Sequence, residues 1–229
     1  MNDSYKDIIR KIEYKINSIN APNQTILIMN DLLETICLVD VLKLFNIPTL
    51  LRLKVVNGKF NKYITRSLKY LELNCNYSQI TNNQLKVLGG CNSINLIYCK
   101  NITNEGIKAL AGCHRINISD CRNAGDDGIK ALGGCHTINI SCTKVTDKGV
   151  KALAGCHTID ISWTEVTDKG LKALCGCHTI NLTGCKNITD EGIKELYGCH
   201  SINLIGCSNI TNEGIKALKE RNPNVQIIK

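Results

Sequence analysis

Cysteine is followed directly by histidine at five places in the sequence, and thiolate and imidazole are the ligands that zinc prefers. The five histidines are His114, His136, His157, His178 and His200. A zinc site needs several such side chains to converge, whereas neighbouring residues of an extended chain point to opposite sides. The pattern therefore predicts a buried row of thiols and a separate row of imidazoles, with no metal site and no cofactor.

A cysteine next to a histidine can also act as a nucleophile activated by a base, which requires one thiol with a lowered pKa. Here the thiols are equivalent, and equivalent thiols in an apolar core are inert. Cys175 departs from the row, two residues before Cys177, and we interpret it as a packing residue. No acid–base pair, phosphate loop or isolated nucleophile is present, so we expect a protein without catalytic residues that is not an enzyme.

Lysines recur with nearly the same spacing as these cysteine–histidine pairs, and such a row could bind an anionic ligand. They are Lys86, Lys108, Lys130, Lys151, Lys172, Lys194 and Lys216. An aspartate stands four residues before four of them, at Asp126, Asp147, Asp168 and Asp190, which is the spacing of ion pairs on a helix surface. We therefore expect a solvated helical face. The net charge is +8 but aromatic residues make up only 4% of the chain, so we expect no nucleic-acid partner.

The spacing of all these residues comes from an internal repeat. One series is Cys91, Cys113, Cys135, Cys156, Cys177 and Cys199, separated by 22, 22, 21, 21 and 22 residues. A second series is Cys99, Cys121, Cys142, Trp163, Cys185 and Cys207. A fixed period of this length indicates a solenoid. We place the residue missing from the two shorter units between the two series.

Each unit reads as one short strand followed by one short helix. Apolar and polar residues alternate in Ile138-Asn139-Ile140, the period of a strand with one buried face. In 188–196 a threonine suited to capping precedes apolar residues at helical spacing. A single unit cannot bury its own apolar face, so the units must stack to form a core.

The repeated pattern Cys-x-x-Ile-x-Leu-x-x-Cys-x-x-Ile-Thr-Asp-x-Gly-Ile-x-x-Leu resembles the cysteine-containing leucine-rich repeat and covers residues 70–229. The resemblance implies an α/β solenoid, with a curved parallel sheet, short helices on the convex side and a concave strand face that engages a partner protein. On that face we expect specificity at polar or irregular positions. The candidates are Arg115, Asn117, Asp120, Asn139, Asp160, Trp163 and Asn181. Trp163 either anchors a partner or fills the slot of a thiol, and the sequence favours neither.

Residues 33–69 carry no repeat and read as short amphipathic helices broken by Pro48 and Gly58. Their apolar pattern runs through Ile47, Pro48, Leu50, Leu51, Val56 and Phe60. This segment resembles an F-box, the helical module that binds Skp1 in cullin-RING ubiquitin ligases, although the family's opening Leu-Pro reads Leu33-Glu34 here. The resemblance implies a Skp1-binding surface made of Leu33, Ile36, Pro48, Leu50, Leu51, Val56 and Phe60. The alternative is that 33–69 only caps the solenoid.

Residues 1–32 form a third, amino-terminal segment, with apolar residues at helical spacing in 5–16. Asp7 and Glu13 argue against a membrane-surface helix, so we expect packing against 33–69 and no membrane partner. The start lacks the pattern of a secretory signal, and fourteen cysteines without such a signal indicate reduced thiols inside the cell, in the cytoplasm or the nucleus.

These segments together predict a substrate adaptor that presents a target protein on its solenoid to a Skp1–cullin–RING ligase. The alternative is a stand-alone leucine-rich repeat scaffold, such as a pathogen effector, with no link to a ligase.

Overall fold

The computed structural model describes residues 68, 71–76 and 78–229. Leu73–Lys229 forms one compact unit. The residues predicted to bind Skp1, Leu33, Ile36, Pro48, Leu50, Leu51, Val56 and Phe60, lie outside the described part of the chain, as do the segment 1–32 and nearly all of 33–69. Among the described residues, no helix is both long and apolar enough to cross a bilayer.

Strands and helices alternate through the described residues. The strands are β1 (Glu72–Asn74), β2 (Ser93–Asn95), β3 (Arg115–Asn117), β4 (Thr137–Asn139), β5 (Thr158–Asp160), β6 (Thr179–Asn181), β7 (Ser201–Asn203) and β8 (Gln226–Ile228). The helices are α6 (Asn82–Leu88), α7 (Asn104–Lys108), α8 (Asp126–Ile129), α9 (Asp147–Val150), α10 (Asp168–Leu171), α11 (Asp190–Lys194) and α12 (Asn212–Arg221). Short 3₁₀ segments, η1 (Lys130–Leu132), η2 (Lys151–Leu153) and η3 (Lys172–Leu174), extend three of the helices.

The strands form one sheet in chain order, and from β2 to β8 each neighbouring pair is parallel and in register. The central isoleucines therefore stack, as Ile138 does on Ile116 and Ile159, and all three are almost completely buried. The residues on either side of each central isoleucine remain partly or fully accessible. This confirms the predicted alternation of a buried and an open strand face.

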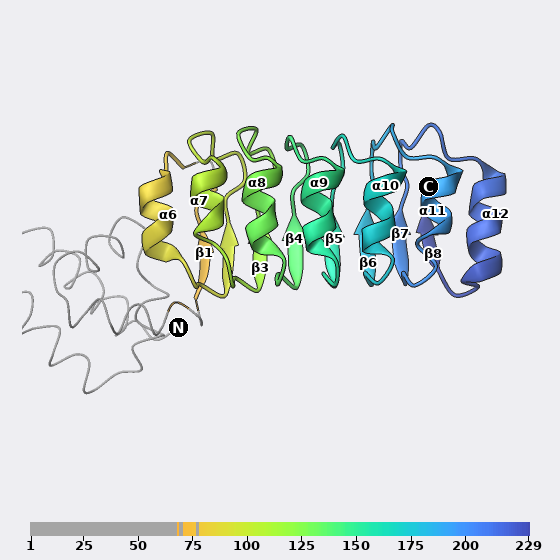
Figure 1. The fold of residues 1–229 in the computed structure, drawn as a ribbon, viewed down its shortest axis with the longest axis horizontal. Coiled ribbons are helices and arrows are strands. Elements are labelled where there is room, and N and C mark those ends of the chain that lie inside the picture. The colour runs from red at the N-terminus through yellow and green to blue at the C-terminus, as the bar shows by residue number, and fades with distance from the viewer. Residues whose placement is uncertain (1–67, 69–70, 77) are drawn as a thin grey trace, which may run out of the picture. The chain divides into compact units, whose positions relative to one another are not determined.

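The helices form a second layer, in which α6 to α12 stand side by side in chain order (Figure 1). Isoleucine, valine and leucine from this layer fill the space behind the strands, as Val150 and Leu171 do with no exposed surface. The predicted threonine caps are present: the Thr146 hydroxyl accepts from the N–H of Lys148, and Gly125 occupies the same position without a side chain. Thr103 is the exception, since its hydroxyl accepts from Asn82 instead of capping its own helix.

The aspartates before the lysines do not form the ion pairs that their spacing predicted. Asp147 accepts from the N–H and the hydroxyl of Thr167 in the next repeat, at 2.8 and 2.7 Å. Asp126, Asp168 and Asp190 make the same two bonds with the next threonine along. The ion pairs within the described helices join residues three apart, as in Asp127–Lys130. The prediction was wrong because a carboxylate at the start of one helix lies closer to the cap of the next helix than to its own lysine.

The second series of thiols was also misaligned in the two shorter repeats. Cys121 is buried and donates to the Leu96 carbonyl at 3.1 Å, and Cys185 makes the equivalent bond to Ile161. In the shorter repeats this slot holds Thr143 and Thr164, both buried. The missing residue therefore follows the slot instead of preceding it. Cys142 and Trp163 stand one position earlier, outside the core.

Candidate partner-binding face

The open face of the strands carries a shallow hollow of about 330 Å³ over β2 to β5. Its lining includes four of the predicted partner-binding residues, namely Arg115, Asn117, Asn139 and Asp160. The rest of the lining combines small polar residues, such as Thr137 and Thr158, with the buried isoleucines of the strand centres, Ile94, Ile116 and Ile138. Because these side chains project from in-register strands, their spacing is set by the sheet. Such a surface suits an extended or irregular protein segment more than a compact small molecule.

A row of side-chain amides runs along the carboxyl ends of the strands and is fixed by hydrogen bonds. The Oδ1 atom of Asn139 accepts from the N–H and the hydroxyl of Ser141, at 2.9 and 2.7 Å. Asn181 does the same with Thr183. These local bonds hold each side chain in one rotamer, so little conformational entropy remains to be lost when a partner binds.

Asp160 takes the place of asparagine in this row and joins its neighbours together. Its Oδ1 accepts from the N–H and the hydroxyl of Ser162, at 2.9 and 2.6 Å. Its Oδ2 accepts from the amide groups of Asn181, at 2.9 Å, and Asn139, at 3.4 Å. The structure therefore brings three predicted residues, Asn139, Asp160 and Asn181, into one network. All the hydrogen-bond donors to Asp160 are neutral, so within the described residues its negative charge is not cancelled by an ion pair.

Asp120 and Trp163 lie beyond the hollow, at the edge where each strand turns toward its helix. Both have a positive φ, 57° at Asp120 and 56° at Trp163, where side chains other than glycine are uncommon. Trp163 is 58% exposed. The interpretation that its indole fills a thiol slot is therefore wrong, because Thr164 occupies that slot.

The five histidines form a continuous stack on the opposite edge of the strands. Neighbouring ring centroids are 4.6 to 4.7 Å apart and the rings are inclined by 9 to 28°. The three central imidazoles also hydrogen bond through Nδ1 to the hydroxyl of the threonine that follows each of them. As predicted, the imidazoles lie apart from the buried thiols. No group of histidine, cysteine, aspartate or glutamate among the described residues has the arrangement of a metal site.

This stack predicts a loss of thermal stability in mild acid. Desolvation by the neighbouring rings, and then the charge of adjacent histidines, lower the pKa of His136 and His178 in the folded chain. Folding therefore favours the neutral rings, so their contribution is complete above the ordinary pKa of about 6.5 and declines as the pH falls below it. The melting temperature should drop between about pH 7 and 5.5. A variant with His136→Asn, His157→Asn and His178→Asn should show a flatter profile; an unchanged profile would contradict the assignment.

Burial raises the pKa of most of the buried thiols; Cys113 is an exception, because its hydrogen bond with Cys91 lowers its pKa. Burial raises the pKa of Cys135 and of Cys177 to about 12, with a further contribution from neighbouring thiols. Thirteen described cysteines are free, and all are buried except Cys142 and Cys175, which are partly accessible. A thiolate is the reactive form, so a high pKa and burial act together against a catalytic role.

Alkylation of the folded chain should therefore be selective. At about pH 8 we expect iodoacetamide to modify Cys142 and Cys175 at least about 100-fold faster than the buried cysteines, which must wait for local opening. Peptide mass spectrometry over a time course measures each site, and the same reaction in denaturant serves as the control. Similar native rates at all the described cysteines would contradict the buried row.

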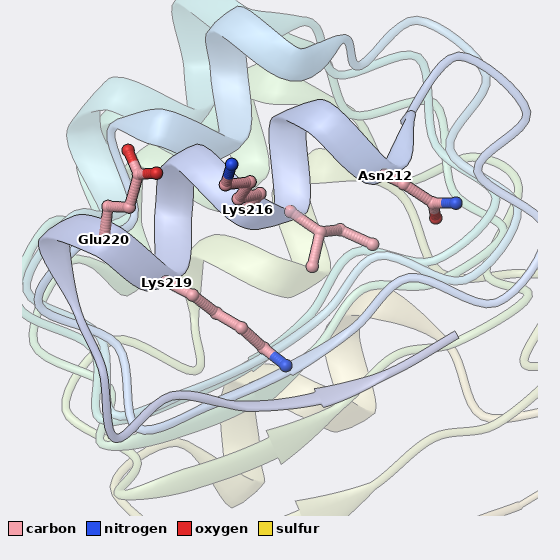
Figure 2. A pocket seen from close by; sticks show the side chains of 5 residues that line it. Asn212, Lys216, Lys219 and Glu220 are labelled. Carbon is pink, nitrogen blue, oxygen red and sulfur yellow. The ribbon is translucent and has the colours of Figure 1, made fainter.

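A second hollow, of about 500 Å³, lies against the last helix and is lined by Ile215 and the four residues labelled in Figure 2, all of which project from α12. In the inner repeats the equivalent helix face packs on the next helix. Asn212 stands where α8 to α11 have the aspartate that binds the following threonine, and where α6 and α7 have Asn82 and Asn104. Among the described residues no further helix packs on this face of α12, and we assign the hollow no ligand.

A one-strand, one-helix unit repeated every 21 or 22 residues around a row of buried isoleucines and leucines defines a leucine-rich repeat solenoid. A family model described as Leucine Rich repeat matches residues 136–154, 157–175 and 178–196. A search of curated protein sequences found no match.

Solved structures share this fold at low sequence identity. An internalin (inlF) from Listeria monocytogenes is 17% identical with a TM-score of 0.57, covering 72% of this chain and 49% of its own. Internalin C2 from the same organism is 18% identical, with a TM-score of 0.54 over 72% of this chain and 73% of its own. TLR13, from a complex with ssRNA13, is 16% identical, with a TM-score of 0.54 over 72% and 26%. This chain thus spans about half the length of the first internalin, and the likeness concerns the fold alone.

Proposed function

We propose that this protein is a protein-interaction adaptor that holds a target on the open strand face and its carboxyl edge. The observation that carries the proposal is the fixed row of polar side chains joined through Asp160, next to an exposed tryptophan. Tryptophan is enriched among the residues that dominate binding energy at protein interfaces. Fixed polar side chains add hydrogen bonds in a defined register.

We further propose that the segment 33–69 links this target to a Skp1–cullin–RING ubiquitin ligase inside the cell. The support is the sequence resemblance of that segment to an F-box and its position directly before the repeats. The chain would then supply recognition, while other subunits carry out ubiquitin transfer.

The test is co-purification of the full chain from cells with Skp1 and a cullin, followed by quantitative mass spectrometry. The double variant Leu50→Ala, Leu51→Ala should lose Skp1 while keeping the other captured proteins. Trp163→Ala is the reciprocal control, which should keep Skp1 and lose the target. If the native chain is folded and captures no Skp1, the ligase link is wrong.

The second candidate is a stand-alone scaffold in which residues 1–69 only cap the solenoid. It shares the strand-face site and therefore makes the same prediction for Trp163→Ala. It differs in one respect, since the Leu50→Ala, Leu51→Ala variant would then change stability without removing any partner. Circular dichroism melting of the two variants alongside the co-purification separates the candidates.

A further inference from the structure

Trp163 belongs to a row of residues that occupy the same position in each repeat, just after the carboxyl end of the strand. The members with positive φ are Tyr98, Asp120, Cys142, Trp163, Gly184 and Gly206. The N–H of each of the first five donates to a carbonyl in the next repeat, as Trp163 does to Thr183 at 2.9 Å. The side chains of the row are therefore set side by side, one per repeat, and differ only in chemistry.

The indole of Trp163 lies against Gly184, the next member of the row. A Cβ atom built on Gly184 would come within 2.6 to 2.8 Å of three carbons of the indole, so the ring covers the place where a side chain would stand. Contact on that side still leaves the residue 58% exposed. Glycine at 184 thus creates a seat for the indole and leaves it accessible to a partner.

Among the described residues, the two exposed tyrosine rings, Tyr98 and Tyr197, each lie against a cation of the chain. The ammonium of Lys100 lies 4.6 Å from the centre of the Tyr98 ring, and Lys100 is the second residue after Tyr98. The guanidinium of Arg221 lies 4.4 Å from the Tyr197 ring. These are the distances of cation–π contacts. The second residue after Trp163 is Glu165, which cannot supply a cation, and no cation–π contact to Trp163 occurs within the described residues.

Charge around Trp163 also differs from that of the other repeats. Four of the five positions equivalent to Glu165 hold a cation, and the fifth holds a neutral serine; they are Lys100, Arg122, Lys144, Lys186 and Ser208. Asp160 replaces the asparagine of its row, and its carboxylate is bonded only to neutral donors. The repeat that carries the tryptophan is thus the one that exchanges a neutral side chain and a cation for two carboxylates. Both changes favour a positive charge in this place.

We propose that the indole of Trp163 is the binding site for an arginine or lysine side chain of the partner protein. The cation lies on the accessible part of the indole, and the carboxylates of Asp160 and Glu165 balance its charge. The inference rests on the proposed function, because it names the chemistry of the partner at the same face. The partner would thus supply the cation for Trp163, as Lys100 supplies it for Tyr98.

The sequence contains a single tryptophan, so its indole N–H gives one resonance that reports on this site alone. The experiment follows that resonance in ¹⁵N-labelled full-length protein during titration with the peptide acetyl-Ala-Arg-Ala-amide. We expect a saturable shift with a Kd in roughly the millimolar range, as for one side chain bound alone. A peptide with citrulline in place of arginine has nearly the same shape without the charge. It should bind about tenfold more weakly.

Glu165→Lys restores the arrangement found at Tyr98 and Lys100, and should weaken the arginine peptide by about tenfold or more. Glu213→Lys makes the same charge change at an exposed position on the last helix and should leave the affinity within about twofold. Equal shifts with arginine and citrulline, or no saturable shift with the arginine peptide, overturn the inference. Neither result removes the proposed function, which fails only if the native chain captures no protein that Trp163→Ala loses.

Discussion

Gly149→Ala is expected to lower the free energy of unfolding by about 2 kcal/mol, although alanine favours a helix more than glycine does by about 1 kcal/mol. A Cβ at Gly149 would stand 2.7 Å from Oδ1 of Asp126, 3.0 Å from Val145 and 3.1 Å from the Cα of Asp126. The Gly149 N–H also donates to that carboxylate, at 3.0 Å. Room can be made only if the two repeats move apart, and each repeat is stable only through its neighbours.

The matched control is Gly134→Ala. A Cβ at Gly134 would meet nothing within 4 Å, so this change should alter the free energy of unfolding by no more than about 0.5 kcal/mol. Urea unfolding of the full-length chain followed by circular dichroism measures both variants. Equal effects at the two glycines would show that the close approach of neighbouring helices is not under steric constraint.

Trp163→Gly is expected to weaken target binding by at least about 30-fold, the loss typical of a central aromatic anchor. The fold should tolerate the change, with the free energy of unfolding altered by no more than about 1 kcal/mol. Two effects oppose each other here: glycine relieves a left-handed backbone, while the contact of the indole with Gly184 is lost. Binding of the captured target to immobilised variants measures the first quantity, and urea unfolding measures the second.

Cys142→Gly is the matched control, because Cys142 has the same backbone conformation one repeat earlier, with a φ of 55°. It should relieve the same strain and leave target affinity within about threefold. If Cys142→Gly weakens binding as much as Trp163→Gly does, the effect belongs to the backbone of the edge and the indole is not the anchor.

The sequence determined the architecture because the same pattern of strand and helix residues recurs in every repeat. One isoleucine flanked by polar residues predicts a strand weakly, but the same triplet in Ile116, Ile138 and Ile159 at a fixed period predicts a stacked parallel sheet. The separation of imidazoles from thiols followed in the same way, from the alternation of side chains in an extended chain. The row of histidines and the row of buried cysteines were therefore predictable from the sequence alone.

Contacts between repeats were not predictable at this level. The aspartates looked like partners of the lysines four residues on, yet Asp147 bonds to Thr167, twenty residues away. Sequence spacing describes neighbours along one helix, whereas the stack places a second helix at the same distance. Asp147 bonds to the next helix because that helix offers both the N–H and the hydroxyl of Thr167.

At Trp163, too, the sequence determined one part of the outcome and the tertiary structure the other. Its identity and its break with the cysteine series were visible in the sequence, but its alignment was not, since deleting one residue before or after the thiol slot gives the same period. The tertiary structure decided it, because the turn after the strand places Thr164 in the buried slot, where its hydroxyl donates to the carbonyl of Ile161 at 2.6 Å. With the slot filled, the indole has no place in the core and lies on Gly184 at the surface. The repeat thus fixed the fold, and packing between neighbouring repeats decided which of its exceptions face a partner.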